Sequence, residues 1–431
     1  MKIGWVAIVA LLAVAGGVGW FVLQNDDGAA PAERAATAPD ARQQRAAFDP
    51  GAPLTPQLQP IAERVNRADF AAMGPLVGAP PLNATDSSSP AAATPPADSS
   101  AATSTEGRGA EDATVEERTA GGPTDPVMIR AQVMLDRAHF SPGVIDGRNG
   151  ENVRNALTAF ERARGLNPDG ALDAQVWVAL TQGDANPAVR GYTIAAEDVR
   201  GPFVAETPDT FPEMAELETL AYRNAAEALA EKFHMDEDLL RELNPNVDFA
   251  RAGQVVLVAA VGDTPLPAEI DRVEVDSDLV QVRAYAGDRL AAVYPATVGS
   301  SAFPSPRGSM TVRAVAANPN YTYNPGVITF GRERNGDRLL TIPPGPNNPV
   351  GSTWIDLSEP TYGIHGAPEP QDVGKTASHG CVRLTNWDAR ELGRAVRTGA
   401  SVTFTGNRTG GTRAPSSQPT TPRPAASGAR T

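Results

Sequence analysis

Ser378-His379-Gly380-Cys381-Val382-Arg383-Leu384 holds the single cysteine of the 431-residue chain. One thiol cannot close an internal disulfide. Two of the four histidines lie near it in sequence, His379 within the stretch and His365 in the upstream segment Tyr362-Gly363-Ile364-His365-Gly366. A thiol becomes a strong nucleophile when an imidazole takes its proton, and glycine beside it lets a carbonyl substrate approach the backbone. The stretch therefore predicts a cysteine acyl-transfer site.

These residue types alone leave the interpretation open, because a lone Cys is often a small buried apolar residue and a lone His a satisfied core residue. A family resemblance favours catalysis. His365-Gly366 followed by Ser378-His379-Gly380-Cys381-x-Arg383 resembles the active-site signature of the YkuD-type (ErfK/YbiS-like) L,D-transpeptidases, enzymes of the bacterial cell wall. The similarity extends upstream through Ile342 to Gly351.

The resemblance implies that Cys381 is the nucleophile and His365 the general base. A backbone carbonyl near Gly366 would accept the other ring N–H of the imidazole and fix its tautomer. Ser378 and His379 are expected to shape the site. Backbone amides from Gly380 to Val382 would donate to the developing oxyanion, a contribution on the order of 3 kcal/mol per donor.

Arg383 and Gly366 are the predicted substrate-binding residues. Residues i and i+2 of a strand face the same side, so Arg383 would lie on the side of Cys381 and bind a substrate carboxylate. The alternative for Arg383 is a structural salt bridge. His365, His379 and Cys381 offer three zinc ligands, but 378–386 contains no acidic residue and the chain no second Cys, so we predict no metal and no cofactor.

The resemblance also implies the substrate. Such enzymes attack the carbonyl between the third residue and the D-alanine of a stem tetrapeptide, release D-alanine and hold the acyl chain as a thioester. The acceptor stays open: another stem (a 3-3 crosslink), a lipoprotein lysine, a free D-amino acid, or water, which would make the protein a carboxypeptidase. Two other functions also remain, a cysteine peptidase or amidase of the wall and a noncatalytic wall-binding scaffold.

The chain begins with an apolar segment, residues 1–24, in which Ile3 to Leu23 carries no charge. This length spans a bilayer as a helix and predicts an uncleaved transmembrane anchor. A cleavable signal peptide is the alternative, with Ala13-Val14-Ala15 as the cleavage site. We therefore expect the protein in the cell envelope, on the periplasmic side of the inner membrane, or secreted to the periplasm if cleaved.

Residues 25–123 are rich in Ala, Pro, Ser, Thr and Gly, which predicts a disordered linker, with one short apolar patch, Leu58 to Phe70, that has helical spacing. Residues 407–431 have a similar bias and predict a disordered tail. A linker of this kind would let the following domains search a layer some distance from the membrane.

Residues 124–183 predict a small three-helix unit with Asp-Gly and Pro-Gly turns. The unit resembles the peptidoglycan-binding domain that accompanies many wall enzymes, although Glu161 stands where that family often has Gln, and the turn residues also fit a purely structural role. Residues 189–262 resemble a lysin-motif domain in their later half. Between Tyr192 and Ala225 an acidic, Pro-containing insert departs from that family, and the excess of acidic residues disfavours a nucleic-acid partner.

The catalytic domain is expected at residues 269–406. Short β-rich segments between Gly, Pro and Asn clusters predict an antiparallel β domain, with a hairpin turn at Gly287-Asp288 and a helix from Asn386 to Val396. The predicted fold class is thus a multidomain chain: a transmembrane helix, a disordered linker, a small α-helical peptidoglycan-binding-like domain, an α+β lysin-motif-like domain and a β-rich YkuD-like catalytic domain.

Overall fold

The computed structural model describes residues 52–70, 124–182, 184, 186–262, 265–266, 268–300, 304–326, 336–378 and 380–406. The predicted transmembrane segment 1–24 and the predicted tail 407–431 lie outside these residues. Within the described ranges, no helix has both the length and the apolar character needed to cross a membrane.

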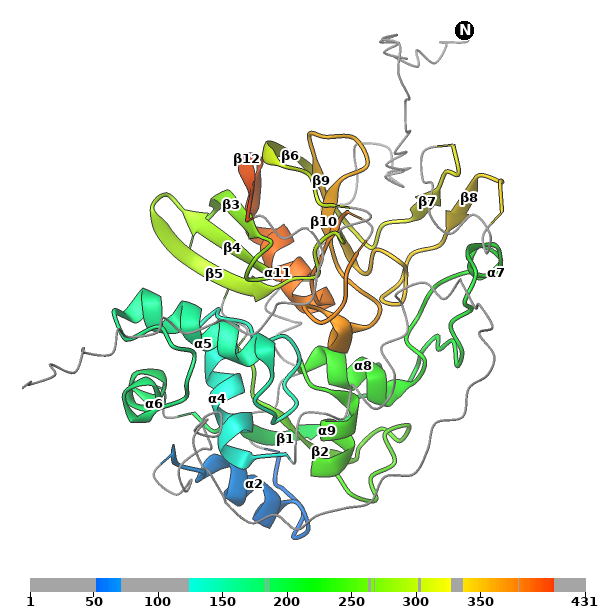
Figure 1. Ribbon diagram of the computed structural model, residues 1–431. Coiled ribbons are helices and arrows are strands. Elements are labelled where there is room, and N and C mark those ends of the chain that lie inside the picture. Colours follow the sequence, from blue (N-terminus) through cyan, green and yellow to red (C-terminus); the bar gives the residue numbers. More distant parts are fainter. Residues whose placement is uncertain are drawn as a thin grey trace, which may run out of the picture.

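The C-terminal domain is built on an eight-stranded sheet in the order β11-β10-β9-β6-β12-β3-β4-β5 (Figure 1). Its strands are β3 (Ile270–Asp276), β4 (Gln281–Ala286), β5 (Arg289–Pro295), β6 (Gly308–Ala317), β9 (Thr353–Leu357), β10 (Gly363–His365), β11 (Val382–Arg383) and β12 (Val396–Thr405). Most neighbours are antiparallel, as predicted, but β10 pairs with β11 and β3 with β12 in parallel, which the prediction of an antiparallel domain did not include. A separate antiparallel pair, β7 (Tyr321–Tyr323) and β8 (Leu340–Ile342), completes this domain.

The predicted hairpin turn and helix are both present in the C-terminal domain. Gly287 adopts φ 59° between β4 and β5, a left-handed conformation that favours glycine. Helix α11 (Asn386–Ala395) begins where the Thr385 hydroxyl accepts the Asp388 N–H at 3.2 Å, a standard N-cap. Leu392 lies on its buried face, in the same apolar core as the sheet. A short 3-10 turn, η3 (Pro370–Asp372), precedes the cysteine motif.

The three-helix unit has the predicted architecture, with α4 (Pro126–Arg137), α5 (Glu151–Arg164) and α6 (Ala174–Thr181). Asp125 and Asp173 cap α4 and α6 with their carboxylates, and α5 ends at Gly165, φ 69°. Glu161 is fully buried, where its carboxylate accepts the Gly170 N–H at 2.9 Å. Burial raises the pKa of Glu161, and the side chain acts on the turn rather than on an outer surface.

Residues 189–262 fold as two antiparallel strands, β1 (Val189–Thr193) and β2 (Val255–Ala259), with helices α8 (Ala225–Lys232) and α9 (Glu237–Leu243). Helix α9 ends at Leu243, and its C-cap Asn244 lies directly before Pro245, so Asn244-Pro245 is at a helix end, as predicted. The insert contains a short helix, α7 (Phe211–Met214), which packs beside β7 and β8.

Part of the predicted linker is folded. Residues 52–70 contain helix α2 (Gln59–Asn66), and Leu58, Ala62 and Val65 are buried in the core around β1 and β2. The Asn66 amide donates to the Val189 carbonyl and accepts the Val189 N–H, both at 2.9 Å, so it pairs with the outer edge of β1. The helical spacing of this patch was seen in the sequence, but the prediction that all of 25–123 is disordered is wrong here.

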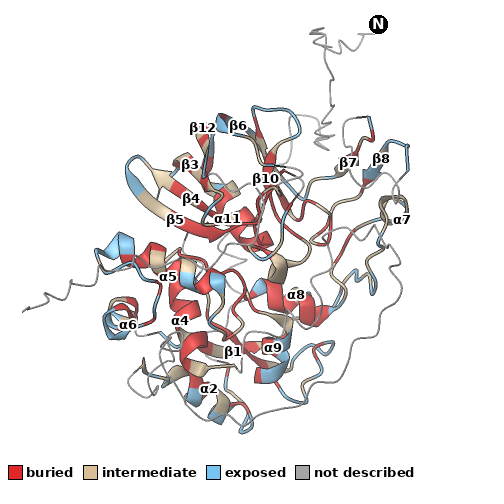
Figure 2. Cartoon of the chain, viewed as in Figure 1, coloured by how far each residue is buried: buried red, intermediate tan, exposed pale blue. Residues whose placement is uncertain are grey.

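The parts of the chain pack directly on one another. In Figure 2 the buried residues continue from the sheet through α11 into α4 and α8. Strand β5, the edge of the eight-stranded sheet, is covered by the three-helix unit: Ser141 N–H donates to Val293 O and Val293 N–H to His139 O, each at 2.8 Å. This contact closes an edge that would otherwise expose unpaired backbone groups.

Candidate active site

The cysteine motif enters the edge strand β11, and its register places the predicted residues together. Ile364 pairs with Val382 and His365 with Arg383 across the parallel β10–β11 pair. Cys381 immediately precedes β11, and alternate residues of a strand share a face. Cys381, Arg383 and His365 are therefore on the same face of the sheet, and the side shared by Cys381 and Arg383 was predicted from strand alternation.

Ser378 holds the loop before the cysteine. Its hydroxyl donates to the Cys381 carbonyl at 2.5 Å and accepts the Gly380 N–H at 3.2 Å. Gly380 has φ 120°, and a Cβ built there would lie 3.1 Å from the Tyr362 ring. The loop therefore needs glycine at this position for both conformation and space. The predicted residue His379 lies outside the described residues.

The Gly380 amide was one of three predicted oxyanion donors. Because it already donates to Ser378, and the Val382 amide lies within the β10–β11 ladder, the Cys381 amide remains as the candidate. A second hydrogen bond holds the loop, because the Ser305 hydroxyl donates to the Gly380 carbonyl at 3.0 Å. These bonds fix the backbone before any substrate arrives, which is the condition for oxyanion stabilisation without reorganisation.

His365 is buried, and its tautomer is set by one hydrogen bond. A carbonyl oxygen can only accept, so Nδ1–H donates to the Gly366 carbonyl at 2.6 Å and Nε2 is left unprotonated. The predicted orienting role of a carbonyl near Gly366 is confirmed. Burial, together with the nearby Arg383 guanidinium, lowers the pKa of His365 to about 3. The Trp354 ring stacks on the imidazole, with 5.4 Å between the ring centroids.

Cys381 is partly exposed and rests as a thiol. Burial raises its pKa, and the Gly363 N–H and the Arg383 guanidinium oppose that rise by stabilising the thiolate. The thiol group donates weakly to the Thr361 carbonyl, with 3.5 Å between Sγ and O. At neutral pH the site therefore pairs a neutral thiol with a neutral imidazole, an arrangement suited to proton transfer during attack.

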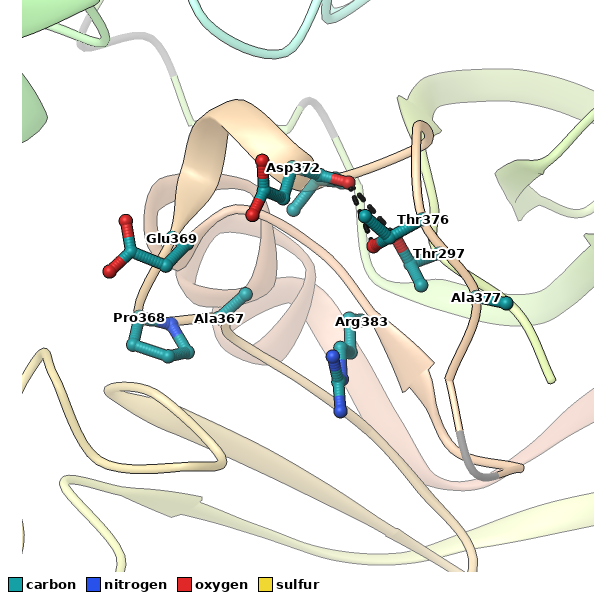
Figure 3. A pocket seen from close by; sticks show the side chains of 9 residues that line it. Thr297, Ala367, Pro368, Glu369, Asp372, Thr376, Ala377 and Arg383 are labelled. Carbon is teal, nitrogen blue, oxygen red and sulfur yellow. Dashed lines mark hydrogen bonds between the residues drawn. The ribbon is translucent and has the colours of Figure 1, made fainter. Parts of the chain in front are cut away.

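Arg383 also lines a pocket of about 190 Å³ beside the motif. Figure 3 shows Arg383 below two carboxylates of the pocket, Glu369 and Asp372, with Thr297 at the side. Neither Cys381 nor His365 lines this pocket, so Arg383 connects it to the reactive groups. Among the described residues no ion pair to Arg383 is present, which weakens the alternative of a structural salt bridge.

Two tyrosines beside the thiol were not among the predicted site residues. The pKa of Tyr321 is raised by burial and by the nearby Cys381, and the same two causes raise the pKa of Tyr362. Tyr362 adjoins the His365 segment and was visible in the motif. Tyr321 lies on β7, far away in sequence, and nothing local marked it.

No group of three or more His, Cys, Asp or Glu in the described part of the chain is arranged to hold a metal ion. The described residues of the site are thus a thiol, an imidazole, a guanidinium, two phenols and backbone amides. Such a set performs acyl transfer through proton transfer and charge stabilisation.

Comparison with known proteins gives two family matches. Residues 270–404 match the YkuD model, described as an L,D-transpeptidase catalytic domain, and residues 124–180 match a peptidoglycan binding domain. The lysin-motif likeness of residues 189–262 stays a prediction.

Individual relatives agree with the family matches. The chain is 29% identical over 182 residues to the L,D-transpeptidase YkuD of Bacillus licheniformis, covering 42% of this chain and 92% of that protein. It is 28% identical over 185 residues to the L,D-transpeptidase YcfS of Escherichia coli K12, covering 41% of this chain and 57% of that protein. Among solved structures, an L,D-transpeptidase from Mycobacterium smegmatis matches with 20% identity and a TM-score of 0.27, covering 35% of this chain and 66% of that one.

Proposed function

We propose that this chain, whose residues 270–404 match the YkuD L,D-transpeptidase catalytic domain and whose residues 124–180 match a peptidoglycan-binding domain, is an L,D-transpeptidase that acts through a thioester on Cys381. The observation that carries this proposal is the neutral His365, held by Gly366 with Nε2 unprotonated, on the same sheet face as the thiol.

In the first half-reaction, His365 Nε2 takes the Cys381 proton as Sγ attacks the carbonyl between the third residue and the D-alanine of a stem tetrapeptide. The Cys381 amide stabilises the oxyanion. The C–N bond then breaks, His365 returns the proton to the leaving amine, and D-alanine departs from the thioester.

In the second half-reaction, an amine acceptor repeats these steps in reverse and releases the thiol. An amine of a second stem gives a 3-3 crosslink, and a lipoprotein lysine or free D-amino acid gives an attached product. Arg383 is proposed to bind a substrate carboxylate, supported by its position between the thiol and the pocket with no ion pair to a described residue.

The chain is proposed to act on the periplasmic side of the inner membrane, with residues 1–24 as an anchor or cleaved signal. The substrate polymer lies outside the membrane, and the apolar N-terminal segment supplies a route to it. Residues 189–262 are proposed as a glycan-binding element, supported by their two-helix, two-strand architecture.

Two measurements test the catalytic proposal. Mass spectrometry after incubation with a carbapenem should show one adduct on the wild type and none on Cys381→Ala, and His365→Ala should slow acylation by roughly 10²-fold to 10⁴-fold. Incubation with purified sacculi should yield crosslinked dimers. Shortened stems without dimers would indicate a carboxypeptidase, and an unchanged wall would indicate a scaffold. An adduct on Cys381→Ala would overturn the assignment of the nucleophile.

A further inference from the structure

Helix α8 of the lysin-motif-like region contacts helix α11 of the catalytic domain through buried polar side chains. Glu231 of α8 is only 5% exposed, and both of its carboxyl oxygens accept from Asn386 Nδ2 at 3.1 Å. Asn386 is the first residue of α11 and is fully buried. The same Nδ2 also donates to the Pro346 carbonyl at 3.1 Å, so one amide joins a neighbouring domain to two parts of the catalytic domain.

The oxygen of the Asn386 side-chain amide packs against the segment that contains His365. Its Oδ1 accepts the Ser352 N–H at 2.9 Å. A Cβ on Gly366 would lie 2.2 Å from this oxygen, and one on Gly351 would lie 2.3 Å from it. Asn386 Oδ1 therefore packs directly against the Gly366 backbone, whose carbonyl orients the imidazole.

We propose that Glu231 and Asn386 are positioning residues for the base: they hold the Gly366 carbonyl where it keeps His365 Nδ1 protonated and Nε2 free toward the thiol. This inference rests on the proposed role of His365 as general base. Through it, a region outside the catalytic domain contributes to the chemistry without touching substrate.

The surroundings of Glu231 determine which substitution is conservative. Tyr222 OH donates to it at 3.3 Å, Arg390 of α11 and Glu227 of its own helix are the nearby charges, and Arg223, Asp236 and Glu237 line the small pocket that it adjoins. Burial raises the pKa of Glu231 to about 8. Glu231→Gln keeps the length of the side chain and an acceptor for Asn386, whereas Glu231→Ala removes the acceptor.

The test uses the full-length protein and four variants: Glu231→Ala, Glu231→Gln, Asn386→Ala and, as the matched control, Ser141→Ala. Ser141 donates to Asp388 of the same helix at 2.9 Å from another domain, away from Gly366. The carbapenem acylation rate is measured against reagent concentration, so that the maximal rate and the half-saturating concentration separate. Melting temperatures are recorded, and the Nδ1–H signal of His365 is followed by NMR of ¹⁵N-histidine-labelled protein.

We expect Glu231→Ala and Asn386→Ala to lower the maximal rate by about 10-fold to 100-fold, since small misplacements of a catalytic group cost this much, with the half-saturating concentration unchanged. The His365 Nδ1–H signal should shift or broaden in these two variants. Glu231→Gln should restore both the rate and the signal, and Ser141→Ala should alter neither, whatever its melting temperature.

Three results would overturn the inference. They are a wild-type maximal rate in Glu231→Ala, an unchanged Nδ1–H signal in both alanine variants, or a loss in Ser141→Ala as large as that in Glu231→Ala. Failure of the proposed function looks different, because then His365→Ala would acylate like the wild type regardless of Glu231.

Discussion

Cys381 and His365 are both neutral at rest. The pKa of His365 is lowered to about 3, and the pKa of Cys381 is raised. Neither the imidazolium nor the thiolate of a resting ion pair therefore predominates at pH 7. The sulfur becomes nucleophilic as its proton moves to Nε2. This state protects a partly exposed thiol from unselective alkylation and oxidation, which follow thiolate character.

The charge states predict a specific pH profile for Cys381. Alkylation by iodoacetamide should rise with pH and reach its midpoint above the ordinary thiol value of roughly 8.5. The rate should have no inflection from His365 between pH 5 and 7, because His365 stays neutral there. His379→Ala controls for the neighbouring imidazole. An inflection in this range that is lost in His365→Ala would instead show an imidazolium–thiolate pair.

The conformation of Gly380 leads to a second prediction. Gly380→Ala places a side chain at φ 120° and against Tyr362, so we expect a stability loss of about 1–3 kcal/mol and slower acylation. Gly399→Ala is the matched control, since Gly399 also has a positive φ, 85°, but open space around it. Denaturant unfolding and carbapenem acylation measure both effects. Equal acylation rates in the two variants would contradict a role for the loop in positioning the thiol.

Helix α7 contacts β7 and β8 of the catalytic domain, which the sequence did not predict. Phe211 packs its ring 5.5 Å from Tyr321 and 5.2 Å from Tyr323, and Leu220 joins Tyr323 and Ile342 in a small apolar cluster. The Leu220 backbone is bonded to Pro344 and Asn347, within the Ile342–Gly351 segment that resembled the family. The insert that departs from the lysin-motif family thus packs against β7 and β8, and β7 carries Tyr321 beside Cys381.

Phe211→Ala should therefore affect the catalytic domain from outside it. We expect a stability loss of about 1–3 kcal/mol from the lost apolar contact and a several-fold slower acylation, because Tyr321 loses its support. Phe203→Ala, in the same insert with a side chain 37% exposed, is the control and should leave both unchanged. Wild-type acylation in a folded Phe211→Ala protein would show that the insert does not act on the site.

Local patterns predicted the elements that local physics determines. The helix starting at Asn386, the Gly287 turn and the side shared by Cys381 and Arg383 follow from capping, φ and strand alternation. The parallel pairing of β10 with β11 and the contact of Phe211 with Tyr321 join segments far apart in sequence. No short-range signal encodes such contacts, so they required the structure.

For the whole molecule, α11 is the point where the domains meet. Its Asn386 bonds Glu231, its Trp387 stacks on His234 at 5.0 Å, its Asp388 accepts from Ser141, and its Glu391 pairs with His139 at 2.9 Å. The two preceding regions thus attach to the helix that directly follows the cysteine motif. An accessory region bound this way fixes the orientation of the catalytic face relative to whatever it binds.

The position of α2 predicts the outcome of N-terminal truncation. Removing residues 1–123 takes Leu58 and Val65 out of a shared core, at about 2 kcal/mol each, and the melting temperature should fall. Removing residues 1–50 should leave it unchanged. Carbapenem acylation by each folded protein should match the full chain, because α2 lies far from Cys381. Equal melting temperatures for the two truncations would show that α2 does not dock in solution.

The docking of α2 also changes what a cut in the chain achieves. Residues 70 and 124 both belong to the folded body, so a protease that cleaves between them produces two fragments that stay bound through the α2 contacts. Whatever is attached upstream of residue 52 then remains attached to the enzyme. Release from that attachment is governed by local unfolding of α2, an equilibrium process with its own free energy, and not by cleavage of the peptide alone.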